Sequence, residues 1–285
     1  MTHILIHSLE HAFGDSLKIL PFLFITYLVM EFLEKRAGEK TNLWLEKAGK
    51  TGPAVGGVLG VIPQCGMSTV ASNLYSGRVI SVGTLLAIYL STSDEMLPIM
   101  ISQSVETAVI VKILAVKVGI AMAAGFLVDF IYQILKKEEH ENMKIHDFCE
   151  HEHCHCEDGI LKSAVRHTVQ IFMFVLLITI VLNIGIEIIG EEQLADFILN
   201  RPLLGPVLAG VIGLIPNCAS SVVITQMFLD GLMSFGTMMA GLLVGAGVGV
   251  LVLLRVNENR KESFKIIGIL YLIGTLCGIV LNYLI

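Results

Sequence analysis

The chain has 285 residues, of which 54% are hydrophobic and 15% are charged, and its mean hydropathy is +0.77. Soluble domains carry about 25% charged residues, so this composition excludes an ordinary soluble protein and indicates a polytopic membrane protein. The net charge of −6 says little about partners because acidic residues concentrate in one central loop. We predict the lipid bilayer as a partner and no nucleic acid.

Eight apolar segments follow one another along the chain, several of them separated by glycines and turn residues. They cover approximately residues 12–33, 53–76, 79–101, 106–135, 163–189, 206–229, 232–254 and 263–285. The second and sixth segments share a phrase, GGVLGVIPQCGMS (56–68) and AGVIGLIPNCASS (209–221), offset by 153 residues. The shift aligns Gly57 with Gly210, Gly60 with Gly213, Pro63 with Pro216 and Cys65 with Cys218. The sequence therefore predicts two transmembrane repeats, 1–135 and 160–285, joined by a polar linker at 136–159.

Basic residues predict how the repeats lie in the membrane. Lys and Arg concentrate in 34–52, 136–162 and 255–265, whereas 101–106 has none and 190–205 has only Arg201. Loops rich in Lys and Arg lie on the cytoplasmic side. We therefore expect the central linker to be cytoplasmic and both termini to be extracytoplasmic, in the inner (plasma) membrane.

This orientation requires 53–76 and 206–229 each to enter and leave on one side, as hairpins with the Pro-Gln-Cys and Pro-Asn-Cys turns at their tips. The predicted fold class is an all-α polytopic membrane protein with two inverted-topology repeats. Each repeat has three full spans plus one re-entrant or broken-helix hairpin. The alternative is two ordinary spans kinked at Pro63 and Pro216, which would place the basic linker outside the cytoplasm.

The two tips are candidate binding sites. Hydrophobic segments broken by Gly and Pro at matching positions of two repeats mark transporter binding sites, and non-helical backbone at membrane depth needs protein or water around it. Amide, thiol and hydroxyl groups near the tips are the candidate ligands: Gln64, Cys65, Ser68, Asn217, Cys218 and Ser221. The alternative is that the small residues there only pack helices.

The segment STSDEMLP (91–98) adds two carboxylates inside an apolar stretch. Intramembrane carboxylates are costly and indicate function, so Ser91, Asp94 and Glu95 are further candidates for binding an ion, and Glu95 for carrying a proton. The alternative is a structural ion pair between Asp94 and Lys112. Position 94 aligns with Gly247, so we expect the two halves to differ chemically, with close packing at the glycines.

The linker contains HDFCEHEHCHCED, the densest group of metal ligands in the chain. Imidazole and thiolate bind Zn²⁺ and similar metals, and cytoplasmic thiols stay reduced. The predicted loop ligands are His146, Cys149, His151, His153, Cys154, His155 and Cys156. Such a loop can also serve only to collect or sense metal.

A second histidine pattern lies at the N-terminus, where His3, His7, His11 and Asp15 recur every four residues and so share one helix face. His7, His11 and Asp15 are candidate metal ligands. The alternative is that they only decorate an interfacial helix.

GVIPQCGMS, STSDEMLPI, GLIPNCASS and the His/Cys-rich loop together resemble the bacterial ten-transmembrane heavy-metal exporter family, whose members are labelled arsenic efflux permeases or manganese transporters. The resemblance covers essentially the whole chain and implies a transporter. Six full spans plus four half-helices also count as ten.

Three functional hypotheses follow. The first is a secondary-active exporter of a divalent metal, Mn²⁺ or Fe²⁺ favoured, working by alternating access with possible proton coupling. The second is efflux of arsenite or an organoarsenical, which would favour thiol ligands. The third is a metal-responsive membrane receptor. No nucleotide-binding or zinc-protease motif is evident, so we predict no enzyme and no required cofactor. The metal ion, Mn, Fe or Zn, is transported or bound by the loop, and a homodimer is compatible with the glycine-rich faces.

Overall fold

The computed structural model describes residues 51–61, 65–93, 96–135, 203–257 and 259–284, with isolated helical positions within 20–28 and 165–180. Within these ranges the regular elements are all helices and no strand occurs. This agrees with the predicted all-α class of membrane protein.

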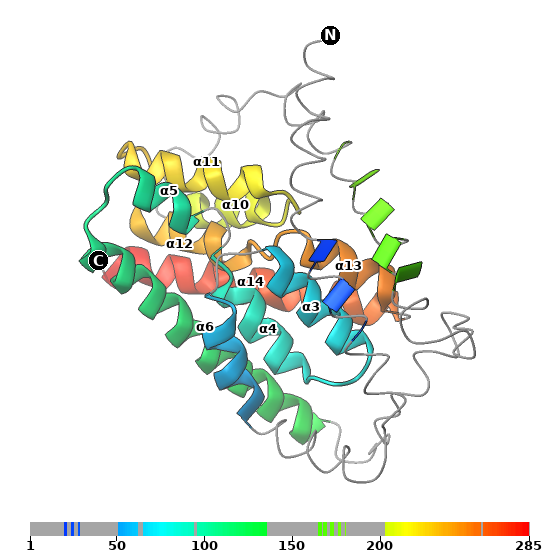
Figure 1. Cartoon of the computed structure of the whole chain (residues 1–285). Coiled ribbons are helices and arrows are strands. Elements are labelled where there is room, and N and C mark those ends of the chain that lie inside the picture. Colours follow the sequence, from blue (N-terminus) through cyan, green and yellow to red (C-terminus); the bar gives the residue numbers. More distant parts are fainter. Residues whose placement is uncertain are drawn as a thin grey trace.

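Each half of the chain supplies the same order of helices (Figure 1). A helix over 51–59 is followed by α3 (Cys65–Ser76), α4 (Val82–Ser91), α5 (Met96–Ser102) and α6 (Thr107–Leu135). The second half has α10 (Leu204–Gly213), α11 (Cys218–Leu229), α12 (Phe235–Val244), α13 (Gly249–Val256) and α14 (Arg260–Leu284). The helices α11, α12, α13 and α14 begin 153 residues after α3, α4, α5 and α6, respectively. The repeat seen in one phrase thus extends to the order of the helices.

The same offset relates the polar groups that begin α4 and α12. Ser81 caps α4 by accepting a hydrogen bond from Thr84 N, and its hydroxyl donates to Asp129 of α6 at 2.7 Å. Ser234 caps α12 in the same way, and its hydroxyl bonds Asn282 of α14 at 2.8 Å. Serine is a favoured N-cap because its oxygen satisfies an orphan backbone N–H. These bonds tie each central helix to the long helix that follows it.

The helices α4 and α12 form the centre of the molecule. All ten residues of α4 are buried, whereas α6 and α14 expose large apolar side chains such as Phe126, Phe130 and Leu276. Helices that are apolar all round belong inside, and exposed apolar faces of this extent suit a lipid environment. Among the described residues, three stretches have the length and composition to cross a membrane: Thr107–Ile134, Phe235–Val256, which includes both α12 and α13, and Arg260–Leu284.

The two halves interlock. Within each half the central helix packs against the long one, α4 on α6 and α12 on α14. Across the halves, α13 packs against α3 and α5 packs against α11, as Figure 1 shows. Each half therefore places its short helix on the other half, and the contact region between them lies beside the ends of α4 and α12.

Both central segments are interrupted, which the sequence analysis did not predict. The segment expected over 79–101 forms α4 and α5, because Thr92 leaves the helix with a ψ of 130°. The segment expected over 232–254 forms α12 and α13, and Gly247 between them has a φ of +54°. This left-handed conformation favours glycine because it lacks a Cβ.

Glycines let the helix over 51–59 lie directly on α4. A Cβ at Gly52 would collide with Thr84, and one at Gly60 would collide with Ser91. Gly205 of α10 repeats this contact in the second half, where a Cβ would lie 2.8 Å from Thr237 Oγ1. Thr84 and Ser91 of α4 therefore serve the packing of this helix.

Candidate functional site

A small cavity lies at the interruption between α4 and α5. Thr92 is the C-cap of α4, Ser93 follows it, and Met96 is the first residue of α5. All three line the cavity. One stretch of chain thus supplies three lining residues, and the hydroxyls of Thr92 and Ser93 donate to the carbonyl oxygens of Ile88 and Ser91, respectively.

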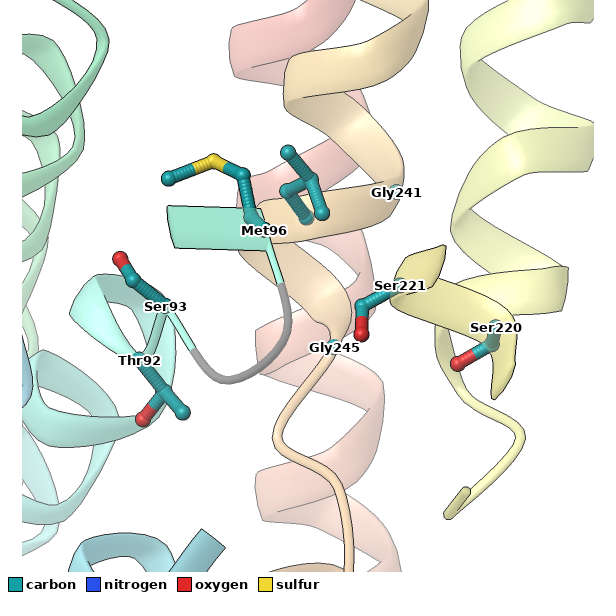
Figure 2. Close-up of a pocket in the computed structure, with 8 residues that line it drawn as sticks. Thr92, Ser93, Met96, Ser220, Ser221, Gly241 and Gly245 are labelled. Carbon is teal, nitrogen blue, oxygen red and sulfur yellow. The ribbon is translucent and has the colours of Figure 1, made fainter. Parts of the chain in front are cut away.

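The second half of the chain forms the rest of the wall. Ser220 and Ser221 lie in the first turn of α11, and Gly241, Leu242 and Gly245 lie at the C-terminal end of α12. Figure 2 shows Gly241 and Gly245 between the residues from α4 and α5 on one side and those from α11 on the other. The cavity volume is about 10 Å³, close to the roughly 10–15 Å³ that one water molecule needs. The space is therefore about the size of one water molecule.

Four helix termini meet at the cavity, where α4 and α12 end and α5 and α11 begin. Terminal turns leave backbone N–H and C=O groups without partners inside the helix, and the carbonyls at a C-terminus carry partial negative charge. Interrupted helices in transporters use these groups to bind ions. The backbone at this place can therefore contribute to a cation site.

Lys117 of α6 brings a charged group to the same place. Its side chain is fully buried (0% exposed). Its Nζ donates a hydrogen bond to the carbonyl oxygen of Thr92 and another, 3.0 Å long, to the carbonyl oxygen of Leu242. Since Thr92 belongs to the end of α4 and Leu242 to the end of α12, the ammonium group joins the two halves beside the cavity.

The equivalent place in the second half is closed. Gly249, the counterpart of Met96, packs so tightly on Ser68 that an added Cβ would lie 2.6 Å from Ser68 Cβ. Tyr89, the counterpart of Leu242, places its hydroxyl 2.7 Å from Ser72 Oγ and 3.1 Å from the Gly249 carbonyl oxygen. The described residues thus pack closely at this place, through hydroxyl contacts and a direct backbone approach.

The structure brings some predicted site residues together and separates others. Ser221 lines the cavity, and the Asn217 carbonyl oxygen accepts a hydrogen bond of 2.8 Å from Ser220 Oγ, directly beside it. Ser91 instead donates to the Ala87 carbonyl oxygen of its own helix at 2.8 Å. Ser68 packs at the closed site. The structure therefore places Ser221 in the cavity wall and the backbone carbonyl of Asn217 next to the lining residue Ser220, whereas Ser91 and Ser68 lie in packing positions.

Asp94, Glu95 and Gln64 lie outside the described residues. Cys65 and Cys218 are the first residues of α3 and α11, but their side chains are also outside the described part. The neighbours of the two carboxylates are nevertheless informative. Ser93 and Met96 both line the cavity, and Asp94 and Glu95 are the two residues between them in the sequence.

The predicted ligands of the central loop and of the N-terminal face also fall outside the described residues. These are His146, Cys149, His151, His153, Cys154, His155 and Cys156, and His7, His11 and Asp15. Among the residues that the structure does describe, no three His, Cys, Asp or Glu side chains come together in a group able to hold a metal ion.

Several cavity residues were missed by sequence reasoning, namely Thr92, Ser93, Met96, Ser220, Gly241, Leu242 and Gly245, together with Lys117. Thr92 and Ser93 could have been found, because they adjoin Asp94. Lys117 could not be distinguished from Lys112 in the sequence, because both lie in the same apolar segment, 106–135. Lys112 is exposed, since α5 leaves α6 and packs against α11 instead.

These observations define a multi-pass helical membrane protein with an ion-sized cavity at interrupted helices. The chain belongs to the family described as "Putative, 10TM heavy-metal exporter", whose model matches residues 1–189 and 155–285, together the whole chain. No match is found among curated proteins or among solved structures. The predicted family is thereby confirmed, and it indicates a metal transporter rather than an enzyme.

Proposed function

We propose that this protein is a secondary-active transporter that exports a divalent transition-metal cation from a bacterial cell, with Mn²⁺ or Fe²⁺ as the favoured substrate. The cavity is its substrate site and Asp94 and Glu95 are its charged ligands. The observation that carries this proposal is the lining of the cavity by Ser93 and Met96, which flank the two carboxylates. Carboxylates at membrane depth mark ion pathways and proton relays, and we assign proton return to Glu95.

The chemistry of the wall supports the choice of metal. Hydroxyl groups come from Thr92, Ser93, Ser220 and Ser221. With two carboxylates they make a mainly hard set of oxygen ligands, which suits Mn²⁺ and Fe²⁺ at least as well as Zn²⁺. The sulfur of Met96 adds one softer ligand, which would favour a transition metal over Mg²⁺ or Ca²⁺.

A re-entrant path around α3 is supported by the contact of Gly52 with Thr84. Gly52 lies in the first turn of the helix over 51–59, which precedes α3, and Thr84 lies in the first turn of α4, which follows α3. Their contact implies that the chain enters and leaves this region at one level. Gly205 and Thr237 make the same contact around α11. We therefore propose two hairpins, with the Pro-Gln-Cys and Pro-Asn-Cys turns at their tips.

Contacts at the two ends of the central segments support the inversion of one half. Arg78, just before α4, lies 3.5 Å from Glu262 in the first turn of α14, the helix that follows α13. Gln103, just after α5, donates a 2.6 Å hydrogen bond to Gln226 in the last turn of α11, the helix that precedes α12. The beginning of one central segment thus lies with the end of the other, at both ends. This is the arrangement expected if the two segments run in opposite directions.

We propose that the two hairpin-bearing halves move against each other and expose the cavity to each side in turn. The pairs α5–α11 and α3–α13 join the halves, so such a motion would open one or the other. In the orientation given by the basic loops, the His/Cys-rich linker is cytoplasmic and would collect metal near the inner mouth of the site. The N-terminal histidines would lie on the external side.

Flux into proteoliposomes tests this proposal. Purified protein is assayed with Mn²⁺, Fe²⁺, Zn²⁺ and arsenite, beside an Asp94→Asn/Glu95→Gln variant and a Glu106→Gln control at an exposed carboxylate. Removing one residue that hydrogen-bonds a metal ligand lowers metal affinity or activity about 10–100-fold. Because the double variant removes the charge of both proposed ligands, we expect its Mn²⁺ flux to fall more than about 100-fold. The control should keep the wild-type rate.

The other outcomes separate the alternatives. Arsenite flux that survives in the double variant would move the site to Cys65 and Cys218 and favour the arsenic hypothesis. If folded wild-type protein carries none of the four substrates, the transporter proposal is wrong and a metal-responsive receptor becomes the better hypothesis.

A further inference from the structure

The buried ammonium of Lys117 donates hydrogen bonds to two carbonyl oxygens at helix ends, a kind of group that can also bind a metal cation. Thr92 follows the last residue of α4, and Leu242 lies in the last turn of α12, so neither carbonyl has the usual partner four residues on. The N–H that would meet Leu242, that of Ala246, instead donates to the Val244 carbonyl oxygen at 2.8 Å. Lys117 Nζ satisfies both groups.

The position of this lysine is costly in itself. A charged side chain at 0% exposure inside a membrane protein requires strong compensation. The negative ends of two helix dipoles contribute to this compensation, one from each half of the chain. Carbonyl oxygens from both halves thus converge on one buried positive charge beside the cavity.

We propose that Lys117 is a built-in cation that competes with the transported metal. While the carrier is empty, its ammonium holds the ends of α4 and α12 together. A divalent cation entering the cavity, whose wall includes Thr92 and Leu242, repels the ammonium and takes over the negative environment. Lys117 is thus a positioning residue that weakens metal binding and couples it to separation of the two halves. This inference rests on the proposed function.

Two consequences follow for transport. The repulsion lowers the affinity for the metal, which helps a carrier to release it on the far side. The ammonium also links α6 of the first half to α12 of the second half, so the substrate must break a link between the halves when it binds. Affinity and maximal rate should therefore change in opposite directions when the charge is removed.

The test is a Lys117→Gln variant, which keeps an N–H donor and removes the charge. The matched control is Lys112→Gln, five residues earlier on the same helix and exposed. Mn²⁺ binding is measured by titration calorimetry and Mn²⁺ flux in proteoliposomes. We expect the Kd of Lys117→Gln to fall at least about tenfold, since two like charges close together repel strongly, and its maximal rate to fall as well. The control should match the wild type in both.

Other results would overturn the inference. If Lys117→Gln and wild type share the same Kd and rate, the inference fails while the proposed function stands. If the variant binds Mn²⁺ more weakly and is also less stable, Lys117 has only a structural role. If the wild type neither binds nor moves Mn²⁺, both proposals fail together.

A measurement on the wild type keeps the inference testable should the variant not fold. Acetylation of Lys117 and Lys112 by an amine-reactive ester is followed by mass spectrometry, with and without Mn²⁺. Displacement from the carbonyls should raise the reactivity of Lys117 several-fold on adding Mn²⁺ and leave that of Lys112 unchanged. Equal reactivity of Lys117 in both conditions would contradict the inference.

Discussion

The interruption between α4 and α5 and the one between α12 and α13 occupy equivalent places but differ in content. The first contains Thr92, Ser93, Asp94 and Glu95, whereas the second, residues 245–248, reads Gly-Ala-Gly-Val. The described part of the first lines a cavity. The second leads into Gly249, which touches the backbone of Ser68.

This difference shows how one scaffold can serve two purposes. Interrupting a buried helix exposes backbone groups that must find partners. At the first interruption a lysine and hydroxyl-bearing residues meet that need around an open space. At the second interruption, Tyr89 and Ser72 of the first half meet it with buried hydroxyls, and α13 packs extensively on α3. Chemistry and close packing are thus divided between the two interruptions.

The largest effect is expected from Gly249→Ala at the closed site. The new Cβ would lie 2.8 Å from the backbone carbon and oxygen of Ser68, which cannot move as a flexible side chain could. Overpacking costs roughly 1–3 kcal/mol and sometimes more, and we expect a loss of about 3 kcal/mol of unfolding free energy. The measurement is thermal unfolding of the purified protein in detergent.

Gly119→Ala provides the control for this substitution. Gly119 lies in α6, and an added Cβ there would meet nothing within 4 Å. Alanine is favoured over glycine in helices by about 1 kcal/mol, so this variant should melt at the wild-type temperature or above it. Equal stability of Gly249→Ala and Gly119→Ala would show that the second site is not closed by packing.

A smaller loss is expected from Tyr89→Phe. The variant removes the hydroxyl between Ser72 and the Gly249 carbonyl oxygen but keeps the ring. Losing a buried hydrogen-bonding partner costs about 1–3 kcal/mol, and Ser72 can still bond Gly249, so we expect about 1–2 kcal/mol. Tyr283→Phe, at an exposed tyrosine, should change nothing. If Tyr89→Phe instead abolished Mn²⁺ flux in folded protein, the second site would have a chemical role too.

Much of the fold could be predicted from the sequence because apolar length and the internal repeat are both strong signals. The segment expected over 106–135 is α6 at 107–135, and helices end and begin again around both Pro-containing phrases. The interruptions after α4 and α12 were missed because both sides of each break are apolar. Hydrophobic periodicity does not register a change of backbone angle at one residue such as Thr92.

The site was harder to predict, because its wall comes from four helices of two halves. Ser221 was identified by its place at the end of the repeated phrase. Leu242 and Lys117 meet only through the packing of α6 against the end of α12, and neither has a local sequence pattern. Which lysine is buried depends on α5 packing against α11 and not along α6. This tertiary contact cannot be predicted from a short stretch of sequence.

The smallest effect concerns the two ends where the halves touch. At one end Glu262 accepts a 2.6 Å hydrogen bond from Tyr75 and lies 3.5 Å from Arg78, whose side chain is 49% exposed. At the other end the link is between the neutral amides of Gln103 and Gln226. Exposed ion pairs contribute about 0–1 kcal/mol and are screened by salt.

Glu262→Gln keeps an acceptor for Tyr75, so we expect a loss of less than about 1 kcal/mol of unfolding free energy, and this loss should vanish at high salt. Gln226→Ala should cost no more and show no dependence on salt in the same melting experiment. A salt-dependent loss in Gln226→Ala, or none in Glu262→Gln, would mean that the two ends do not differ in charge in the way that their contacts indicate.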